Sequence, residues 1–424
     1  MRLNNFLNTV CDNIKYAPVR ETIKTELKEH IIEEKQNYID NGMNDLEAEQ
    51  KAISNMGSPD QISQSFNKIY RKKLDWKLLL IFIILTAINI LLFVSISMKQ
   101  NNDISYIVRN ISYIFIGLVL SFFIYFFNYI SLKKFSIGIG IIGLLISIIN
   151  LYLYDTHNYE ILNNLHINLN ILSIFAYIIA FSSFINSINS IDNANKKNII
   201  FISILSVSSL VLLYLTNDTV LLYTLLAIYI ILTATKLLHS SSKKIKIITL
   251  SLLCIILLYA IFTVTISQPH LLKRMYNNDI EISMMRERLE KSKLIGEANI
   301  PQDVNTDYYY LEFSNYSYIY IIEHYGKIVG LGIIIMLLLL SIKLIFNYKQ
   351  IQDKFGKFLI LGLGLFIFIQ MIFNLFTILG IVNLGMVNLP FITHNNASII
   401  VYMLTISLIL SIYSRKDIII NSES

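Results

Sequence analysis

Residues 381–415 read IVNLGMVNLPFITHNNASIIVYMLTISLILSIYSR. The second half of this stretch, residues 397–414, contains no charged side chain, and Arg415 follows it directly. A helix needs roughly 20 predominantly apolar residues to cross a bilayer, so this run predicts a membrane span. The first half, with Pro390 and the polar residues His394, Asn395 and Asn396, forms a short connection that leads into the span.

Similar apolar runs recur upstream. The chain has 424 residues, of which 54% are hydrophobic and only 15% charged, whereas soluble domains carry about a quarter charged residues. One aqueous core cannot bury this much apolar surface, so a soluble enzyme is excluded. We therefore predict an all-α, ten-span membrane bundle, with the other nine spans at approximately 77–97, 107–130, 136–154, 167–188, 198–215, 219–238, 245–267, 327–346 and 357–380.

The distribution of basic residues predicts the orientation of the spans. Loops on one side carry the pairs Lys133-Lys134 and Lys196-Lys197 and the cluster around Lys243, whereas the short loops on the other side carry almost no Lys or Arg. Under the positive-inside rule, the basic side is cytoplasmic. We expect a multi-pass cell-membrane protein with both termini in the cytoplasm and a large extracytoplasmic loop at residues 268–326.

Residues 1–70 differ in composition from the rest. They carry eight Lys or Arg against eleven Asp or Glu, a net charge of −3, and contain no secretory core. Apolar periodicity predicts three helices: 20–38, with Ile23, Leu27, Ile31 and Tyr38 inward; 44–56, with Ala48, Ala52, Ile53 and Met56 inward; and 59–69, with Ile62, Phe66 and Ile69 inward. Asn41-Gly42 should end the first, and Asn44 with Glu47 should form a capping box for the second.

The order and spacing of several residues in this region resemble a known module. The pattern includes Glu26-Leu27, His30-Ile31, Glu47-Ala48 and Met56-Gly57-Ser58-Pro59. It is similar to the helical prefix domain that precedes bacterial multispan membrane proteins. The resemblance implies a cytoplasmic regulatory or protein-contact role without chemistry.

Polar residues inside the predicted spans are mostly amides. No Asp or Glu lies in the middle of a span, which disfavours an ion-coupled transporter. We expect the buried amides to form interhelical hydrogen bonds: Asn89, Asn128, Asn170, Gln370 and Asn374. Arg109 lies near the outer end of the second span, where it either reaches the interface or faces an outer cavity. Cys11 and Cys254 fall in different segments, so we expect no disulfide framework and no cysteine-based metal site.

The large loop 268–326 is too long for a simple connector. Residues 279–293 predict an amphipathic segment along the membrane surface. Tyr308-Tyr309-Tyr310 and the later tyrosines are expected to form an aromatic belt, with a sugar-stacking platform as the alternative. The carboxylates available on this face are Glu297, Asp303, Asp307, Glu312 and Glu323.

The segment 381–415 resembles the signature of the SEDS family (shape, elongation, division and sporulation), which includes FtsW, RodA and SpoVE. The family consensus is close to Gly-Ile-Pro-Leu-Pro-Phe-Ile-Ser-Tyr-Gly-Gly-Ser-Ser, and residues 389–393 with Ser398 match it. Asn374, Gly380, the segment 325–330 and the segment 116–120 match other family positions. The resemblance covers residues 71–415 and implies ten spans with a large loop before the eighth.

The resemblance also implies a function in peptidoglycan synthesis during division, elongation or sporulation. SEDS proteins resemble membrane glycosyltransferases that polymerise lipid II on the outer face, beside a single-span transpeptidase. The resemblance implies that an acidic residue of the large loop acts as the catalyst and that cationic groups or a divalent cation stabilise the leaving pyrophosphate. We expect lipid II or another lipid-linked precursor as the ligand and no nucleic acid.

The chain departs from the family at its chemical positions. Alignment without a gap places Asn315 at the catalytic acid, and an amide cannot accept a proton at neutral pH. Thr306-Asp307 also resembles the motif, so Asp307 is the candidate catalyst. Candidate substrate-binding residues are Arg109, Pro390, His394, Asn395 and Asn396. A non-catalytic scaffold or sensor and a precursor transporter remain alternatives.

The topology has a direct test. Cysteine labelling at Ile300 should report an extracytoplasmic position, and labelling at Asn195 a cytoplasmic one, because basic loops remain inside. Protection of a cysteine at position 300 from an external impermeant reagent, with reaction at position 195, would contradict the assigned orientation.

Overall fold

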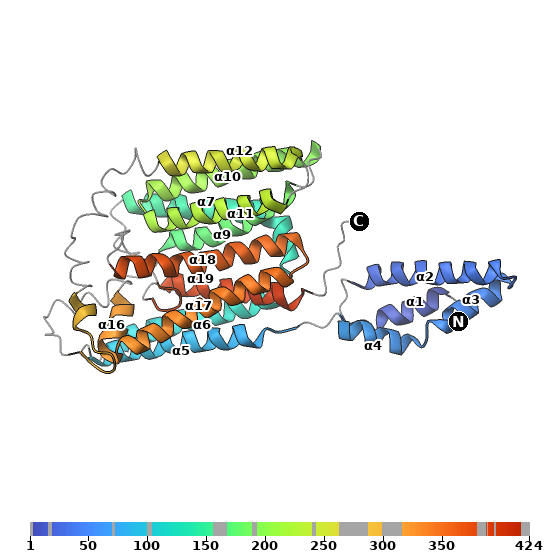
Figure 1. Ribbon diagram of the computed structural model, residues 1–424, viewed down its shortest axis with the longest axis horizontal. Helices are drawn as coiled ribbons and strands as arrows, with labels where there is room; N and C mark the ends of the chain where they lie inside the picture. The colour runs from blue at the N-terminus through green and yellow to red at the C-terminus, as the bar shows by residue number, and fades with distance from the viewer. Residues whose placement is uncertain are drawn as a thin grey trace. The chain divides into compact units, whose positions relative to one another are not determined.

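The computed structural model describes residues 3–15, 19–69, 73–99, 104–155, 168–188, 193–239, 243–262, 287–298, 316–379, 387, 389–393 and 396–416. The described chain is almost wholly helical (Figure 1). It forms two compact units. The amino-terminal unit comprises residues 1–74 with 351–353 and 413–424, and the membrane unit comprises residues 75–350 and 354–412.

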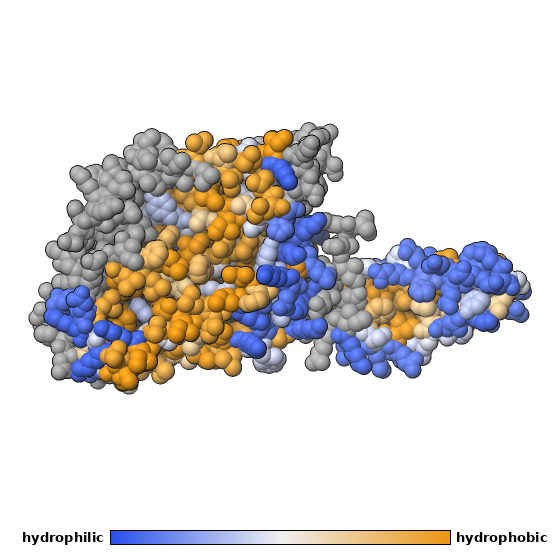
Figure 2. Space-filling model, viewed as in Figure 1, coloured by the Kyte–Doolittle hydropathy of each residue, from blue (hydrophilic) through white to orange (hydrophobic). Residues whose placement is uncertain are grey.

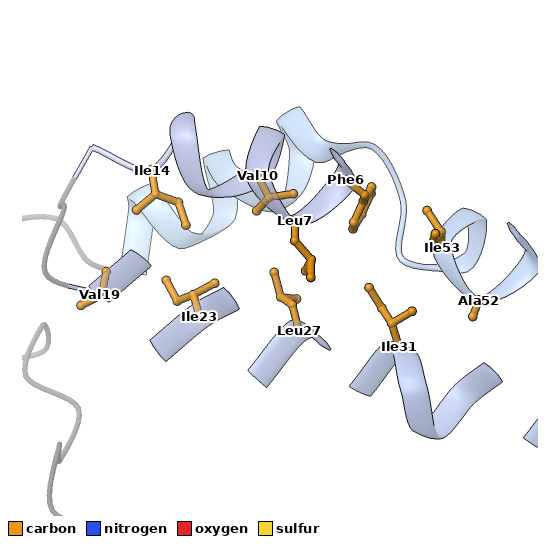
Figure 3. Packing of buried hydrophobic residues seen from close by; sticks show 10 residues of the cluster. All are labelled: Phe6, Leu7, Val10, Ile14, Val19, Ile23, Leu27, Ile31, Ala52 and Ile53. Atoms are coloured by element: carbon orange, nitrogen blue, oxygen red, sulfur yellow. The ribbon is translucent and has the colours of Figure 1, made fainter. Parts of the chain in front are cut away.

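The amino-terminal unit contains four helices: α1 (Leu3–Asp12), α2 (Arg20–Asp40), α3 (Asp45–Asn55) and α4 (Pro59–Ile69). Figure 3 shows its core, in which Phe6, Leu7 and Val10 of α1 face Ile23, Leu27 and Ile31 of α2. The predicted inward faces of α2 and α3 are confirmed, since Ile23, Leu27, Ile31, Ala48, Ala52 and Ile53 are buried.

The prediction of only three helices in this unit is wrong, because α1 was not expected. Its ten residues are too few for a helix that is stable in isolation, for which about 12–15 are needed. Packing against α2 and α4 therefore stabilises α1. The predicted capping box is also absent: Asn44 precedes α3, but its side chain makes no capping hydrogen bond.

The end of α2 follows the predicted pattern. Gly42 has φ +88°, the left-handed conformation that glycine adopts without steric cost. The N–H of Gly42 donates to the carbonyl of Ile39 and that of Met43 to the carbonyl of Tyr38. These two bonds satisfy carbonyl groups that the last turn leaves open.

Among the described residues of the membrane unit, ten long helices overlap the ten predicted runs: α5 (Trp76–Lys99), α6 (Ile104–Phe126), α7 (Ile130–Asp155), α9 (Leu169–Ser187), α10 (Asn193–Leu215), α11 (Thr219–His239), α12 (Lys243–Phe262), α17 (Lys327–Gln350), α18 (Lys354–Ile378) and α19 (Asn396–Ser414). Within the described ranges, eight of these helices are long and apolar enough to cross a membrane. The described parts of α10 and α12 do not meet this criterion. A short helix, α16 (Tyr316–Tyr325), precedes α17.

The helices differ in how much of their surface the bundle covers. In α9 and α19, 83% of the span is buried, against 22% in α6. The helix α9 contacts α7, α10, α11 and α18, which places it inside the bundle (Figure 1). Figure 2 shows the complementary feature: apolar side chains cover the visible middle of the helices, and hydrophilic ones gather at their ends. This pattern is that of a multi-pass membrane protein.

The membrane unit has a loop end and a basic end. The loop end is where α5 ends and α17 begins, and the basic end is where α17 ends and α18 begins, between Lys349 and Lys354.

Deleting residues 1–70 should leave the membrane unit inserted and folded, because the described residues of the core around Leu7 all lie between Leu3 and Phe66. Membrane fractionation and the thermal unfolding midpoint in detergent measure this. The core variant Leu7→Asp should resemble the deletion. Loss of insertion in either protein would show that the membrane unit depends on residues 1–70.

Candidate functional site

A tight turn precedes α19 at residues 389–392. The N–H of Ile392 donates to the carbonyl of Leu389 at 3.1 Å, and Pro390 lies buried within the turn. Phe391 has φ +67°, which is rare for a bulky side chain. Such a conformation costs about 1–3 kcal/mol and persists only where the surroundings impose it.

Two buried amides hold the backbone around this turn. The Asn89 Nδ2 of α5 donates to the carbonyl of Phe391 at 2.7 Å, and the Asn374 Nδ2 of α18 donates to the carbonyl of Val387 at 2.7 Å. Neither asparagine is accessible to solvent beyond 1%. Both lie within spans, where non-helical backbone is tolerated only if its polar groups find partners in the protein.

Aromatic packing fixes the strained residue from the other side. The ring of Phe391 meets Phe82 edge-on at 6.0 Å between centroids and lies 5.5 Å from Tyr402. Tyr402 in turn stacks on Phe366 at 5.6 Å. Helices α5, α18 and α19 therefore jointly impose the conformation of Phe391.

The same helix α5 also contacts α16. Ser95 Oγ and Tyr325 Oη lie 2.5 Å apart. Asn89 and Ser95 are six residues apart, or about 9 Å along a helix. The turn and α16 therefore bind to successive parts of α5 at the loop end.

A buried ion pair lies beside this contact. Glu323 of α16 is only 4% exposed, and Arg288 Nη1 lies 3.1 Å from its Oε1 and 3.3 Å from its Oε2. Burial raises the pKa of the Glu323 carboxyl above its ordinary value, and the positive charge of Arg288 opposes that shift. Removing either partner would leave a buried charge without compensation, which is strongly destabilising.

Residues 287–298 attach to α16 and α17 through their backbone as well. The N–H of Ala298 donates to the carbonyl of Glu323 at 2.8 Å, and the N–H of Lys327 donates to the carbonyl of Lys293 at 3.0 Å. Gly326 joins the two helices with φ +98°, and a Cβ at this position would lie 2.6 Å from the carbonyl oxygen of Leu294. Only glycine permits this close approach.

A second carboxylate at the loop end is Asp218, between α10 and α11. Its Oδ2 accepts from Asn168 Nδ2 at 3.0 Å and from Asn170 Nδ2 at 3.4 Å. Loss of hydration raises the pKa of this carboxyl, and the hydrogen bonds from the two amides oppose the shift. The group ties the start of α9 to the start of α11.

The predicted site residues lie as follows. Pro390 is in the turn, and Asn396 is the buried first residue of α19. Arg109 is half-buried in α6. Helix α6 packs closely on α19 at Gly117, where a Cβ would lie only 2.5 Å from Met403 Sδ. Arg109 and Asn396 precede this contact by eight and seven residues on helices that run in the same direction, so they lie at the same level. The remaining predicted site residues fall outside the described residues: Asp307, Asn315, His394 and Asn395.

The predicted interhelical role of the amides is confirmed for two of them. Gln370 Nε2 donates to Thr224 Oγ1 at 3.1 Å, and Asn170 Nδ2 donates to Thr216 Oγ1 at 2.9 Å. For Asn89 and Asn374 the predicted partner on another helix is wrong, because their side chains donate to the backbone carbonyls of Phe391 and Val387. Asn128 caps locally, its Oδ1 accepting from the N–H of Ile130.

Three features of the large loop were not predicted. Residues 316–325 form a helix, and Tyr318 and Tyr320 are buried, so these two do not form a surface aromatic belt. Glu323, expected to be available on the outer face, is covered and paired with Arg288. The sequence carries no local signal for this pair, because 35 residues separate its members.

In the part of the chain that the structure describes, no three His, Cys, Asp or Glu side chains gather as a metal site would require. The loop carboxylates Asp303 and Asp307 lie outside that part. The divalent cation implied by the resemblance stays a prediction.

Comparison with known proteins agrees with this architecture. Residues 302–417, which include α17, α18, the turn and α19, match the sequence model of the FtsW, RodA and SpoVE family, described as a cell cycle protein. This part of the chain is thus similar to the SEDS family. Over 109 residues the chain is 28% identical to the probable peptidoglycan glycosyltransferase FtsW of Enterococcus hirae, and the alignment covers 25% of this chain and 28% of that protein.

Solved structures share the fold. The chain is similar, with a TM-score of 0.57 and 15% identity, to a chain in a structure described as the structural coordination of polymerization and crosslinking by a peptidoglycan synthase complex. The match covers 80% of this chain and 97% of that chain. A mutant of the rod shape determining protein RodA of Thermus thermophilus matches with a TM-score of 0.54 and 13% identity, over 81% and 98% of the two chains. The prefix-domain resemblance of residues 1–70 stays a prediction.

Asn89→Ala and Asn374→Ala should each release the backbone around the turn, because a buried carbonyl loses its donor at a cost of about 1–3 kcal/mol. Hydrogen exchange should show faster exchange of the peptide that contains residues 387–393. Gln370→Ala is the matched control, since it removes a buried interhelical bond without touching the turn. Equal exchange of that peptide in all three variants would contradict the anchoring role.

Proposed function

We propose that this protein acts in peptidoglycan synthesis, as a glycosyltransferase that polymerises lipid II or another lipid-linked precursor at the outer face of the membrane. The match of residues 302–417 to the family carries the proposal. The anchored turn supports it, since strained backbone held from several sides is typical of functional sites.

In this proposal the loop end faces the outside and both termini lie in the cytoplasm. The support is that Lys99 is the one Lys or Arg in the sequence of the short loops at the loop end, against Lys349 and Lys354 at the basic end. A partner that crosslinks the product fits the synthase complex whose fold this chain resembles, and we propose a transpeptidase with a single span.

The chemistry requires one proton transfer. A carboxylate accepts the proton of the attacking sugar hydroxyl, the new glycosidic bond forms at the donor's anomeric carbon, and the pyrophosphate-linked lipid leaves. Asp307 is the proposed base. Arg109, at the level of the start of α19, supplies positive charge toward the leaving phosphates, and a bound divalent cation would add to this charge.

One observation favours a second function. Asn315 stands at the position that matches the family's acid without a gap, and an amide cannot serve as the base. A non-catalytic scaffold with the same fold would retain the anchored turn and the partner contact while losing polymerisation.

Purified full-length protein assayed for lipid II polymerisation, with and without Mg²⁺, separates the two functions. Asp307→Asn should lower the rate by about a hundredfold or more, the contribution of general base catalysis. Asp303→Asn is the control, because it removes a carboxylate four residues away in the same loop. Full activity in Asp307→Asn would exclude this residue as the base.

The variant Asn315→Asp tests the alternative. It should change little if Asp307 is the base. Polymerisation that appears only in Asn315→Asp would identify the natural protein as a scaffold without its catalyst.

A further inference from the structure

The segment 287–298 presents two different faces. Its first part, helical at residues 287–291, turns Arg288 inward to Glu323. Its second part bends at Leu294, Ile295 and Gly296 and turns two large aliphatic side chains outward. The side chain of Leu294 is 69% exposed and that of Ile295 is 73% exposed, although both are large and aliphatic.

The position of this aliphatic pair is fixed relative to α17. The N–H of Ile328 donates to the carbonyl of Leu294 at 3.2 Å, and the carbonyl of Tyr325 accepts from the N–H of Gly296 at 3.3 Å. Leu294 and Ile295 therefore lie beside the first turn of a span. They cannot be displaced along the helix without breaking these backbone bonds.

The exposed side of α17 continues the same apolar surface. Its solvent-accessible residues recur at the spacing of one helical face and form a stripe along the whole span: Ile328, Leu331, Ile335, Leu339, Ile342 and Ile345. In a membrane-spanning helix such a stripe contacts lipid. The aliphatic pair lies next to the first residue of this stripe, since the N–H of Ile328 bonds to the carbonyl of Leu294.

Charged side chains border the pair where lipid headgroups would lie. Lys293 directly precedes Leu294 and is exposed, and Lys327 is at the first position of α17. Lysine side chains near helix ends reach the interface while their aliphatic stems stay in apolar surroundings. The order of apolar pair and flanking lysines is that of an interfacial anchor.

We propose that residues 287–298 are an interfacial membrane anchor, with Leu294 and Ile295 inserted into the adjacent lipid leaflet and the Arg288–Glu323 ion pair holding the segment to α16. The anchor fixes the middle of the loop between α12 and α16 at the height of the lipid headgroups. It goes beyond the proposed activity and holds whether or not the protein polymerises lipid II.

Depth-dependent fluorescence quenching tests the insertion. Full-length protein with Cys254→Ser, which removes the exposed native thiol, receives one new cysteine at a time: Leu294→Cys or Ile295→Cys. Each is labelled with an environment-sensitive fluorophore in nanodiscs of phosphatidylcholine and phosphatidylglycerol, with or without a spin-labelled lipid. The controls are Glu287→Cys and Lys291→Cys, whose side chains form an exposed ion pair on the same segment.

We expect blue-shifted emission and strong quenching by the spin-labelled lipid at positions 294 and 295. Quenching at positions 287 and 291 should be weak. Water-like emission that aqueous iodide quenches would overturn the proposal, because the pair would then face solvent. Blue-shifted emission without lipid quenching would also overturn it, since protein rather than lipid would cover the pair.

The ion pair has its own variant. Glu323→Gln leaves the Arg288 guanidinium without its counter-charge and should reduce lipid quenching at position 295, and the exchange Arg288→Glu with Glu323→Arg should restore part of it. Glu287→Gln breaks the exposed pair with Lys291 and should change nothing. Undiminished quenching in Glu323→Gln would overturn the role assigned to the ion pair.

Discussion

A lipid bilayer offers no water to a backbone that leaves the helical conformation, and the structure of the loop end depends on how this constraint is met around residues 387–393. The amides of Asn89 and Asn374 donate to two carbonyls of this segment from opposite helices. Each bond replaces water that the bilayer would exclude. The turn can therefore hold Phe391 in a left-handed conformation within the span region.

The contacts of α5 extend this arrangement to the large loop. Asn89 binds the turn and Ser95 binds Tyr325, so one rigid helix sets the distance between the turn and α16. From α16, the buried Arg288–Glu323 pair and the glycine at position 326 carry the arrangement to residues 287–298. A site formed by the loop and the turn would thus be positioned by helices rather than by loop flexibility, which is the arrangement that precise chemistry requires.

Residues at the positions of the family consensus divide into retained buried residues and altered polar residues. The turn keeps Leu389, Pro390 and Phe391, which are buried and determine backbone geometry. The changes from the family consensus include Asn315 at the acid position and His394, Asn395 and Asn396 in place of Tyr-Gly-Gly. Packing constrains buried residues regardless of activity, whereas residues that contact a ligand can change with it. The retained fold is therefore compatible with both a polymerase and a non-catalytic scaffold protein.

The sequence alone determined the helical class, the positions of the ten apolar helices and the inward faces of α2 and α3, because apolar periodicity and run length are local properties. It did not reveal α1, whose helicity depends on packing with α2 and α4. Nor did it show that Asn89 and Asn374 bind a turn, or that Arg288 meets Glu323. These partners are separated by 302, 13 and 35 residues, and only tertiary packing decides which polar groups meet when the surrounding surface is apolar.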